Sequence, residues 1–437
     1  MRTETNNARA GVRLSPGIGL FFALAAMCGA LLWRHADRRA YAPIRAFPDT
    51  LIVDEAEWRG VSVSRLTTEG VVCGPRRDAC QQSPRRDRGF RGPGNGTLLF
   101  DSYAGLSWLD SANHRSVTWA HNGDLPGQLR QVIDIRLAAD SSVLVLDLSN
   151  ASLTTFSFAG AVGQVREYAS TRGREQVLDG ETIIGGAIAS EAVVLLTLAD
   201  GDTIGTEGSA HLVFAPLSVA NPSLRRAVPV AIRTRRVKDR DLQPPTPQFM
   251  PKPFVAVVDS VNAGPSTEIW LVSDREAGRI ETYDLMGHPK RLILVRALAR
   301  APTAEEREST FTAAVHEHYP NVDSASTREA CVAGSGDIVC QTIFYYRRAK
   351  DMALPVVPFA TSVVRAGAGI WIRSFPAPMA DSTVWTLIDR SGRPTRRLSL
   401  AVSDRIEDGD ANRVLVSKLN RNDRREPREL AWRQIEH

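Results

Sequence analysis

A short apolar run followed by a second strand recurs along the chain, and this repeat constrains the fold more than any other feature. The first copy reads Thr97–Asp101 and then Leu106–Asp110, and the second reads Val143–Asp147 and then Leu153–Phe158. The two copies begin about 45 residues apart, a spacing typical of four-stranded propeller blades. The repeat therefore indicates a β-propeller.

Four more copies lie downstream, at Val193–Leu196, Ile269–Val272, Ile338–Cys340, and Ile370–Ile372 with Val384–Asp389. The runs are too short for helices and are rich in β-branched and aromatic residues. We expect each first run to be the inner strand of a blade, because neighbouring blades would bury both of its faces. The sequence thus predicts an all-β, six-bladed β-propeller.

The two ends of the chain could close this ring within a shared blade, which would leave no open sheet edge. The candidate strands are Leu51–Val53 or Val61–Val63 near the start and Val414–Val416 near the end. We further expect two insertions, near 233–253 and 303–320. The first is basic and proline-rich, and the second opens on the capping box of Thr303 and Glu306, which predicts one surface helix.

A 20-residue stretch without charge, Leu14–Trp33, is long enough to cross a bilayer as a helix. Arginines flank it on both sides, as around a signal anchor or a signal peptide, and the lack of a good cleavage site favours an uncleaved anchor. Cys28 is preceded by Met27, which argues against a lipoprotein site. We expect an N-terminal transmembrane or signal helix in 1–35, a linker in 36–50 and the propeller in 51–437.

The other four cysteines form two local pairs, Cys73 with Cys80 and Cys331 with Cys340. An even count after a secretory segment predicts disulfides, and neither spacing fits a zinc site. Disulfides place the domain in an oxidising compartment. The predicted location is therefore the cell envelope, on the periplasmic or extracellular side of the cytoplasmic membrane.

The stretch from Thr97 to Gly160 resembles bacterial extracytoplasmic six-bladed β-propeller proteins of the NHL-like class. Gly123–Gln128 looks like the connection between blades in that group, and Gly369–Val416 looks like its last blade. The resemblance implies the fold. It leaves the function open, because most members of the group have no assigned activity.

Candidate chemical groups in the sequence each have an ordinary structural interpretation. Asp200–Asp202 and Glu407–Asp410 could bind calcium, but Asp-Gly pairs favour hairpin turns. His316–His318 could chelate a metal only if extended, and the capping box predicts a helix there. The arginines near 85–91 and 233–236 could meet anionic lipid or glycan, and we interpret them as solvated loops.

Glycine-rich stretches at Gly92–Gly96 and Gly367–Gly369 are interpreted as loops between blades, because they lead into strands rather than helices. No P-loop or Gly-x-Ser-x-Gly motif occurs, and no cofactor or metal is predicted. The net charge of +5 is spread along the chain, so no nucleic-acid partner is expected.

The sequence favours a non-catalytic binding or scaffold propeller that presents loops to an envelope protein, a peptide or a glycan. The alternative is a lactonase-like, metal-dependent hydrolase with its site at the mouth of the central channel. Convergent Asp, Glu, Asn or His side chains in that channel would favour the enzyme, whereas an apolar or arginine-filled channel would favour the scaffold.

Mass analysis before and after reduction tests the cysteine assignment. We expect Cys73, Cys80, Cys331 and Cys340 to resist thiol labelling until the protein is reduced, because each pair closes a short loop. Four labelled thiols in the unreduced protein would contradict both the disulfides and the envelope location inferred from them.

Overall fold

The computed structural model divides into two units, Met1–Ala46 and Phe47–His437, and the described residues all belong to the second. They are 47–73, 88–110, 116–138, 141–168, 170–172, 175–178, 181–198, 207–217, 226–233, 253–259, 267–273, 278–296, 300–318, 338–351, 357–377, 380–419 and 427–436. Leu14–Trp33 and most of 233–253 lie outside these ranges. Within them, no helix has the length and apolar character that a bilayer crossing requires.

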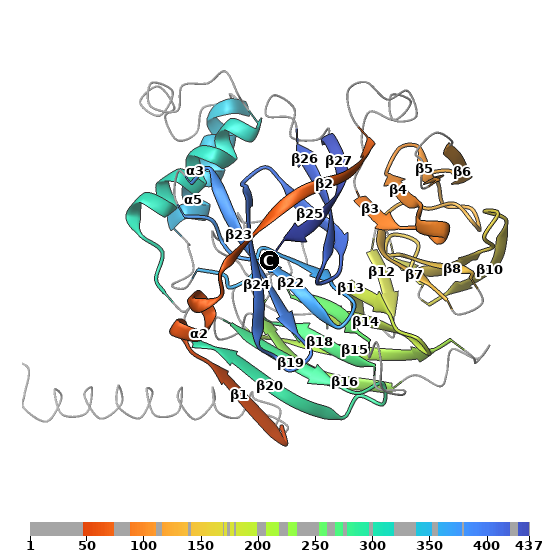
Figure 1. The fold of residues 1–437 in the computed structure, drawn as a ribbon, viewed down its shortest axis with the longest axis horizontal. Helices are drawn as coiled ribbons and strands as arrows, with labels where there is room; N and C mark the ends of the chain where they lie inside the picture. Colours follow the sequence, from red (N-terminus) through yellow and green to blue (C-terminus); the bar gives the residue numbers. More distant parts are fainter. Residues whose placement is uncertain are drawn as a thin grey trace, which may run out of the picture. The chain divides into compact units, whose positions relative to one another are not determined.

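The described chain is mostly β-sheet, and its first three sheets follow one another in sequence (Figure 1). The first contains, in order, β3 (Arg88–Arg91), β4 (Thr97–Asp101), β5 (Gly105–Leu109) and β6 (Ser116–Ala120). The second contains β7 (Val132–Leu137), β8 (Val143–Asp147), β9 (Ser152–Phe156) and β10 (Val162–Glu167). The third contains β11 (Ser170–Arg172), β12 (Glu175–Leu178), β13 (Glu181–Ile188), β14 (Ala192–Leu198), β15 (Glu207–Pro216) and β16 (Arg226–Arg233).

The two remaining sheets each take in a strand from the start of the described chain. One contains β17 (Phe254–Val258), β18 (Glu268–Val272), β19 (Arg279–Tyr283), β20 (Pro289–Val295) and, at its edge, β1 (Asp49–Val53). The other contains β21 (Ser362–Arg365), β22 (Gly369–Arg373), β23 (Ser382–Asp389), β24 (Pro394–Ala401), β2 (Val63–Cys73), β27 (Pro427–Glu436), β26 (Arg413–Leu419) and β25 (Arg405–Gly409). A one-turn helix, α2 (Glu55–Gly60), joins β1 to β2, and a short 3-10 turn, η2 (Pro93–Asn95), joins β3 to β4.

Hydrophobic cores fill the spaces between successive sheets and return to the first one. The last of them joins Val72, Leu415 and Trp432 to Leu99 and Leu109 of the first sheet. Contacts between the leading strands follow the same order, from β7 to β13, β17, β21, β25 and β3. This closed succession of radially packed sheets is β-propeller-like.

Closure by the two chain ends differs from the expected pairing. β2 pairs antiparallel with β27, which lies between β2 and β26, so the strand at Val414–Val416 shares a sheet with β2 but is not its hydrogen-bonded neighbour. The strand at Leu51–Val53 joins a different sheet, where β1 runs parallel to β20. Two N-terminal strands therefore tie the start of the folded unit to two different sheets.

The expectation that the apolar runs are the innermost strands is wrong. Each run forms the second strand of its set, as β4, β8, β14, β18 and β22, and β4 and β14 are buried along their whole length. The second strand has neighbouring sheets on both faces, which explains its apolar composition. The innermost strands face a cavity with both charged and apolar lining residues, and several of them, such as β7 and β25, contain charged residues.

The assignment of a strand to Ile338–Cys340 is also wrong, because this segment opens the helix α5 (Ile338–Asp351). Val339, Ile343 and Tyr346 recur at helical spacing and pack on Phe311 and Val315 of α3 (Ala304–His318). The apolar run was too short to separate a strand from a buried helical stripe. Both helices lie between β20 and β21 in the chain and pack against each other.

The predicted capping box at the start of α3 is present. The Glu306 backbone N–H donates to Thr303 Oγ1 over 3.1 Å, and the Thr303 N–H donates to Glu306 Oε2 over 2.8 Å. Arg300 Nη1 adds a charged hydrogen bond of 2.6 Å to the same carboxylate. The Arg300 bond, together with the Thr303 donors, lowers the pKa of the buried Glu306 carboxyl although its burial opposes this.

Aspartates that end the apolar strands act as turn acceptors. Asp147 is fully buried and accepts the backbone N–H groups of Arg130, Gln131, Ser149 and Asn150. Asp101 and Asp389 accept in the same way from the turns that follow them. The recurring Asp of the repeat is thus explained by hairpin structure.

Two glycine-rich segments lie within sheets and not between blades, which corrects their interpretation. Gly92–Gly96 connects β3 to β4, and Gly367–Gly369 leads from β21 into β22. Gly94 and Gly367 adopt positive φ angles of 62°, which allows these tight turns. Gly123–Gln128 does connect two different sheets, between β6 and β7.

Replacing Glu306 by Ala should lower the free energy of unfolding by about 1 to 2 kcal/mol near neutral pH, because the cap and its charged partner are lost. The pKa of Glu306 is lowered in the fold, so this contribution is present above the ordinary glutamate pKa and is lost as pH falls through the lower folded pKa. Urea unfolding at several pH values measures it. Glu305→Ala, at an exposed position of the same turn, is the control, and equal effects of both variants would contradict the capping role.

Candidate functional site

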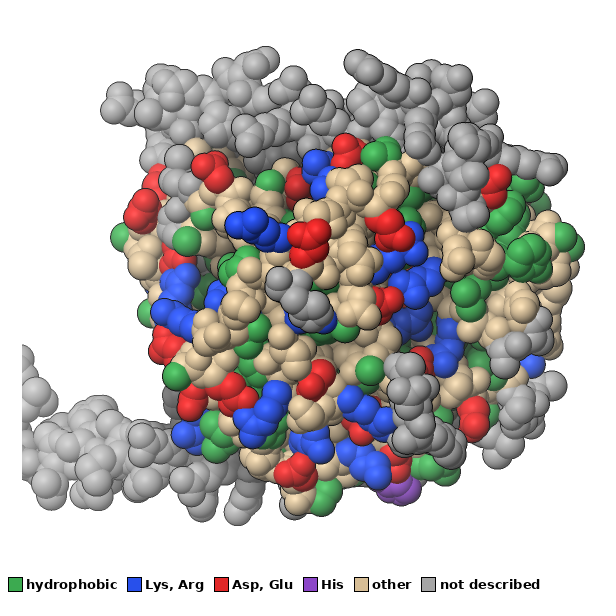
Figure 2. Space-filling view, in the orientation of Figure 1, with side chains coloured by type: hydrophobic (Ala, Val, Ile, Leu, Met, Phe, Trp, Pro, Cys, Tyr) green, Lys and Arg blue, Asp and Glu red, His purple; other side chains and the backbone are tan. Residues whose placement is uncertain are grey.

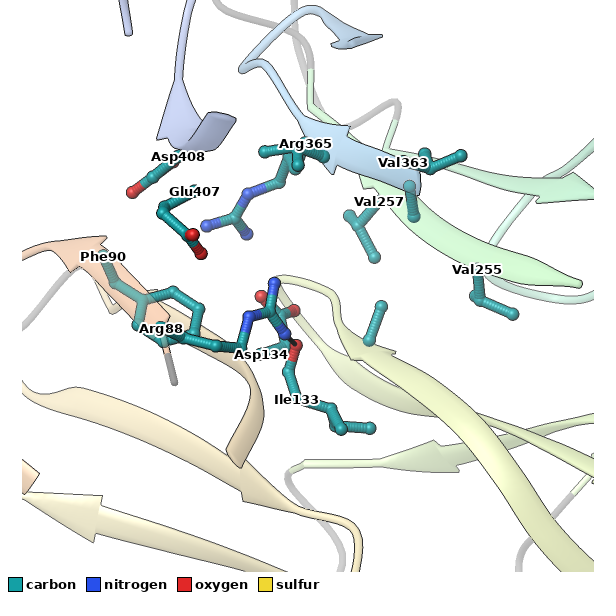
Figure 3. A pocket seen from close by; sticks show the side chains of 13 residues that line it. Arg88, Phe90, Ile133, Asp134, Val255, Val257, Val363, Arg365, Glu407 and Asp408 are labelled. Atoms are coloured by element: carbon teal, nitrogen blue, oxygen red, sulfur yellow. Dashed lines mark hydrogen bonds between the residues drawn. The ribbon is translucent and has the colours of Figure 1, made fainter. Parts of the chain in front are cut away.

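One cavity of about 60 Å³ lies where the innermost strands meet, and it is the candidate site (Figure 3). β3, β7, β13, β17, β21 and β25 all contribute to its lining. Phe90, Ile133, two alanines and several valines form its apolar part. Its charged lining residues are Arg88, Asp134, Arg365, Glu407 and Asp408.

Two arginines direct their guanidinium groups toward the same space in this cavity (Figure 3). Arg365 extends from β21, and its Nη2 donates to the backbone carbonyl of Ile135 on β7 over 3.1 Å. Arg88 extends from β3 and donates to the carbonyl of Ile133, also on β7. Both side chains therefore link strands of different sheets.

Carboxylates around Arg365 compensate its charge. Burial alone would lower the pKa of this guanidinium, but the charges of Asp134, Asp408 and Asp259 outweigh burial and raise it. Asp134 also accepts the backbone N–H of Ile188 on β13 over 2.8 Å. The arginine is held charged by groups from three other strands or their ends.

A third arginine also bridges strands of different sheets. Arg136 of β7 pairs with Asp259, which directly follows β17, at 3.1 Å, and both side chains are largely buried. Arg136 also donates to the carbonyl of Ile188 over 3.2 Å, and Thr267 donates to Asp259 over 3.2 Å. Such a pair in low dielectric depends on every partner being present.

The acidic stretch Glu407–Asp410, expected to be a turn, lies mainly on the innermost strand β25. Ser417 donates to Glu407 over 2.6 Å, yet burial is the larger influence and raises the pKa of this carboxyl. Asp408 accepts the backbone N–H of Arg91 over 2.6 Å. Asp410 pairs with the Arg91 side chain at 2.8 Å. It also caps the following turn by accepting the backbone N–H groups of Asn412 and Arg413.

The arginines near 85–91 are not all in a solvated loop, which corrects their interpretation. Arg88 and Arg91 belong to β3, where the first lines the cavity and the second pairs with Asp410 and lies over the ring of Trp432. Arg85 and Arg86 lie outside the described residues. A long charged side chain on an innermost strand has partners across the channel, which a local sequence pattern does not reveal.

Sequence reasoning missed Arg136, Arg365, Asp134 and Asp259 altogether. Their one local signal is position: the first three lie in the strand immediately before an apolar run. Asp259 follows its strand and has no comparable signal in the local sequence. Its role follows from its placement after β17, beside Arg136.

The other predicted site residues are separate from the cavity. Cys340 lies in α5 and is disulfide-bonded, to a cysteine whose side chain is not among those described. Cys73 ends β2, while Cys80, Cys331 and Asp200–Asp202 fall outside the described ranges. The pairing of these cysteines stays a prediction. His316–His318 end the helix α3, so their backbone does not place alternate side chains on one face.

The size of the cavity limits its chemistry. About 60 Å³ holds a few water molecules, whereas pockets for organic ligands measure about 300 Å³ or more. Among the described residues, no group of three or more His, Cys, Asp or Glu side chains is placed to hold a metal ion. The arrangement can bind water and neutralise charge.

Exposed apolar side chains mark a second region, on the outer part of the first two sheets (Figure 2). Phe158 is 51% exposed and its ring lies 6.3 Å from that of Trp108. Tyr103 and Leu125 are each 66% exposed, in the connections after β4 and β6. These loops present apolar surface to solvent.

Comparison with known proteins finds only distant likeness. No protein-family model and no curated protein matches the chain. A solved DUF4221 family member from Bacteroides vulgatus is 7% identical, with a TM-score of 0.45, over 86% of this chain and 98% of that one. The calcium-binding protein regucalcin from Agrobacterium tumefaciens is 12% identical over 89% and 97%, with a TM-score of 0.38. Virginiamycin B lyase from Staphylococcus aureus is 8% identical over 86% and 99%, with a TM-score of 0.36. These likenesses are too distant to assign a function.

Replacing Arg365 by Met should lower the free energy of unfolding by about 3 kcal/mol, because the carboxylates that surround it lose their compensating charge. Denaturant unfolding followed by tryptophan fluorescence measures the change. Arg65→Met, on the exposed surface of β2, is the matched control and should change stability by about 0.5 kcal/mol or less.

Adding Asp134→Asn to the Arg365→Met variant should recover part of the loss, since one uncompensated carboxylate is then neutral. A loss no greater than that of the control would show that the channel network does not hold the sheets together.

Proposed function

We propose that the protein is a six-bladed β-propeller that serves as a non-catalytic binding or scaffold module in the cell envelope. Its loops would contact an envelope protein, a peptide or a glycan. The count of six blades is supported by β3, β7, β13, β17, β21 and β25, each of which leads a set of four strands. In this count the last blade consists of β25, β26, β27 and β2, joined to its neighbour through a short parallel pairing of β2 with β24.

The observation that carries the proposal is the charge pairing in the central channel. A hydrolase of the lactonase type needs carboxylates that are available to a metal and a substrate. Here Arg136 pairs with Asp259, and Asp134 and Asp408 accept backbone N–H groups. Arg88 and Arg365 occupy the space between them. The channel side chains are therefore engaged in holding the strands.

Exposed loops supply the surface that a binding module needs. Tyr103, Leu125 and Phe158 project from three connections of the first two sheets, and tightly paired hairpins support these connections. Rigid sheets that carry apolar loops are common in protein–protein recognition. This supports a partner for the outer part of the first two sheets.

The envelope location is supported by the sequence. Leu14–Trp33 has the length of a membrane span, and the paired cysteines favour an oxidising compartment. The proposed arrangement is a propeller tethered to the cytoplasmic membrane by its N-terminal segment.

Elemental analysis and a hydrolysis assay test the proposal on the full chain purified in detergent. We expect much less than one metal ion per chain, and lactone and ester hydrolysis no faster than in buffer. Asp134→Asn and Glu407→Gln should then leave these background rates unchanged. The opposite result would be one equivalent of calcium or zinc per chain together with hydrolysis that is abolished by chelation and by Asp134→Asn. That result would contradict the scaffold proposal and favour the hydrolase.

A further inference from the structure

The helix α5 has two faces of different composition. Val339, Ile343 and Tyr346 face α3, and Lys350 pairs with Glu308 of α3 at 2.8 Å. The opposite face contains Phe344, Tyr345, Arg347 and Arg348, all exposed. Phe344 is 51% and Tyr345 38% exposed, and the Tyr345 ring also makes an edge contact with the ring of Tyr346, with 5.4 Å between centroids.

These side chains form a compact group on the helix. Phe344, Arg348 and Tyr345 fall within an arc of about 100°, because successive residues of an α-helix are separated by about that angle. Arg347 flanks them, and Asp351 at the end of the helix is the one acidic residue of this face. The face is therefore aromatic and carries a net positive charge.

The favourable position of cations near a helix C-terminus explains part of this composition, since Arg348 and Lys350 lie in the last turn. It does not explain why Phe344 and Tyr345 stand beside them in solvent. Aromatic rings next to arginines match the headgroup region of a bilayer, where rings rest among the headgroups and guanidinium groups meet lipid phosphates.

We propose that the exposed face of α5 rests on an anionic membrane surface. The 20-residue uncharged stretch Leu14–Trp33 supports this independently, because a tether to a bilayer raises the effective concentration of headgroups around the folded unit. Each arginine near an anionic surface strengthens binding by about fivefold. Two arginines and two rings give a weak contact that the tether makes effective.

Tyrosine footprinting of the full chain in lipid nanodiscs tests the contact. One set of discs contains phosphatidylcholine alone, and the other contains equal parts of phosphatidylcholine and phosphatidylglycerol. Labelling of Tyr345 should be about fivefold slower in the anionic discs, and high salt should remove the difference by screening the arginines. Tyr103, which is 66% exposed in the turn after β4, is the internal reference and should be labelled equally in both.

Arg347→Gln with Arg348→Gln should abolish the protection of Tyr345. The matched control, Arg65→Gln with Lys290→Gln, removes the same amount of charge from exposed positions on β2 and β20. In this control the protection of Tyr345 should remain. Equal thermal unfolding temperatures verify that both variants fold. If the arginine variant unfolds, the effect of high salt on the labelling of Tyr345 in the wild-type protein still tests the membrane contact.

Equal labelling of Tyr345 in the two kinds of disc would overturn the proposal and leave this face to a protein partner. Protection that persists in high salt or without the two arginines would overturn it as well. Neither result bears on the channel or on the scaffold function, which the metal and hydrolysis measurements test separately.

Discussion

Burial of both faces of the second strands is the constraint on which this structure depends. β4, β8, β14, β18 and β22 consist almost wholly of apolar residues, so each needs a sheet on either side of it. This packing removes large apolar side chains from water, and it fully buries Trp270, Trp371 and Trp385 between or within such sheets. A row of sheets with two open ends would leave two of these faces in water. Closure removes that cost, and β2 and β27 complete it by joining the two chain ends in one sheet.

The same closure creates the polar centre. Six strands that converge on one cavity bring both apolar and charged side chains to the centre. Arginines suit this place because a long side chain can reach across to a carbonyl or carboxylate of a distant strand. Arg365 reaches β7 and Arg136 reaches the end of β17. Charge compensation in the channel therefore follows from geometry.

The proposed binding function uses the outer surface of the molecule. The charged residues of the channel pair with each other or with backbone groups, whereas the loops of the first two sheets and the helix α5 expose apolar groups. The insertion that carries α3 and α5 is attached between β20 and β21 without disturbing the order of the strands. An aromatic and basic helix face on such an insertion can evolve without changing the sheets, which is why binding sites concentrate on elements of this kind.

Local patterns in the sequence determined much of what the structure shows. Strand runs such as Val143–Asp147 and the capping box of Thr303 and Glu306 depend on neighbours within a few residues, so the sequence alone predicts them. Only the tertiary structure decided that these runs are second strands, that Ile338–Cys340 is helical, that Arg88 and Arg365 line the central cavity, and that Arg136 pairs with Asp259. The reason is physical. Whether a strand packs on a neighbouring sheet or faces the channel depends on residues more than a hundred positions away in the sequence, and so does the choice of the carboxylate that pairs with an arginine.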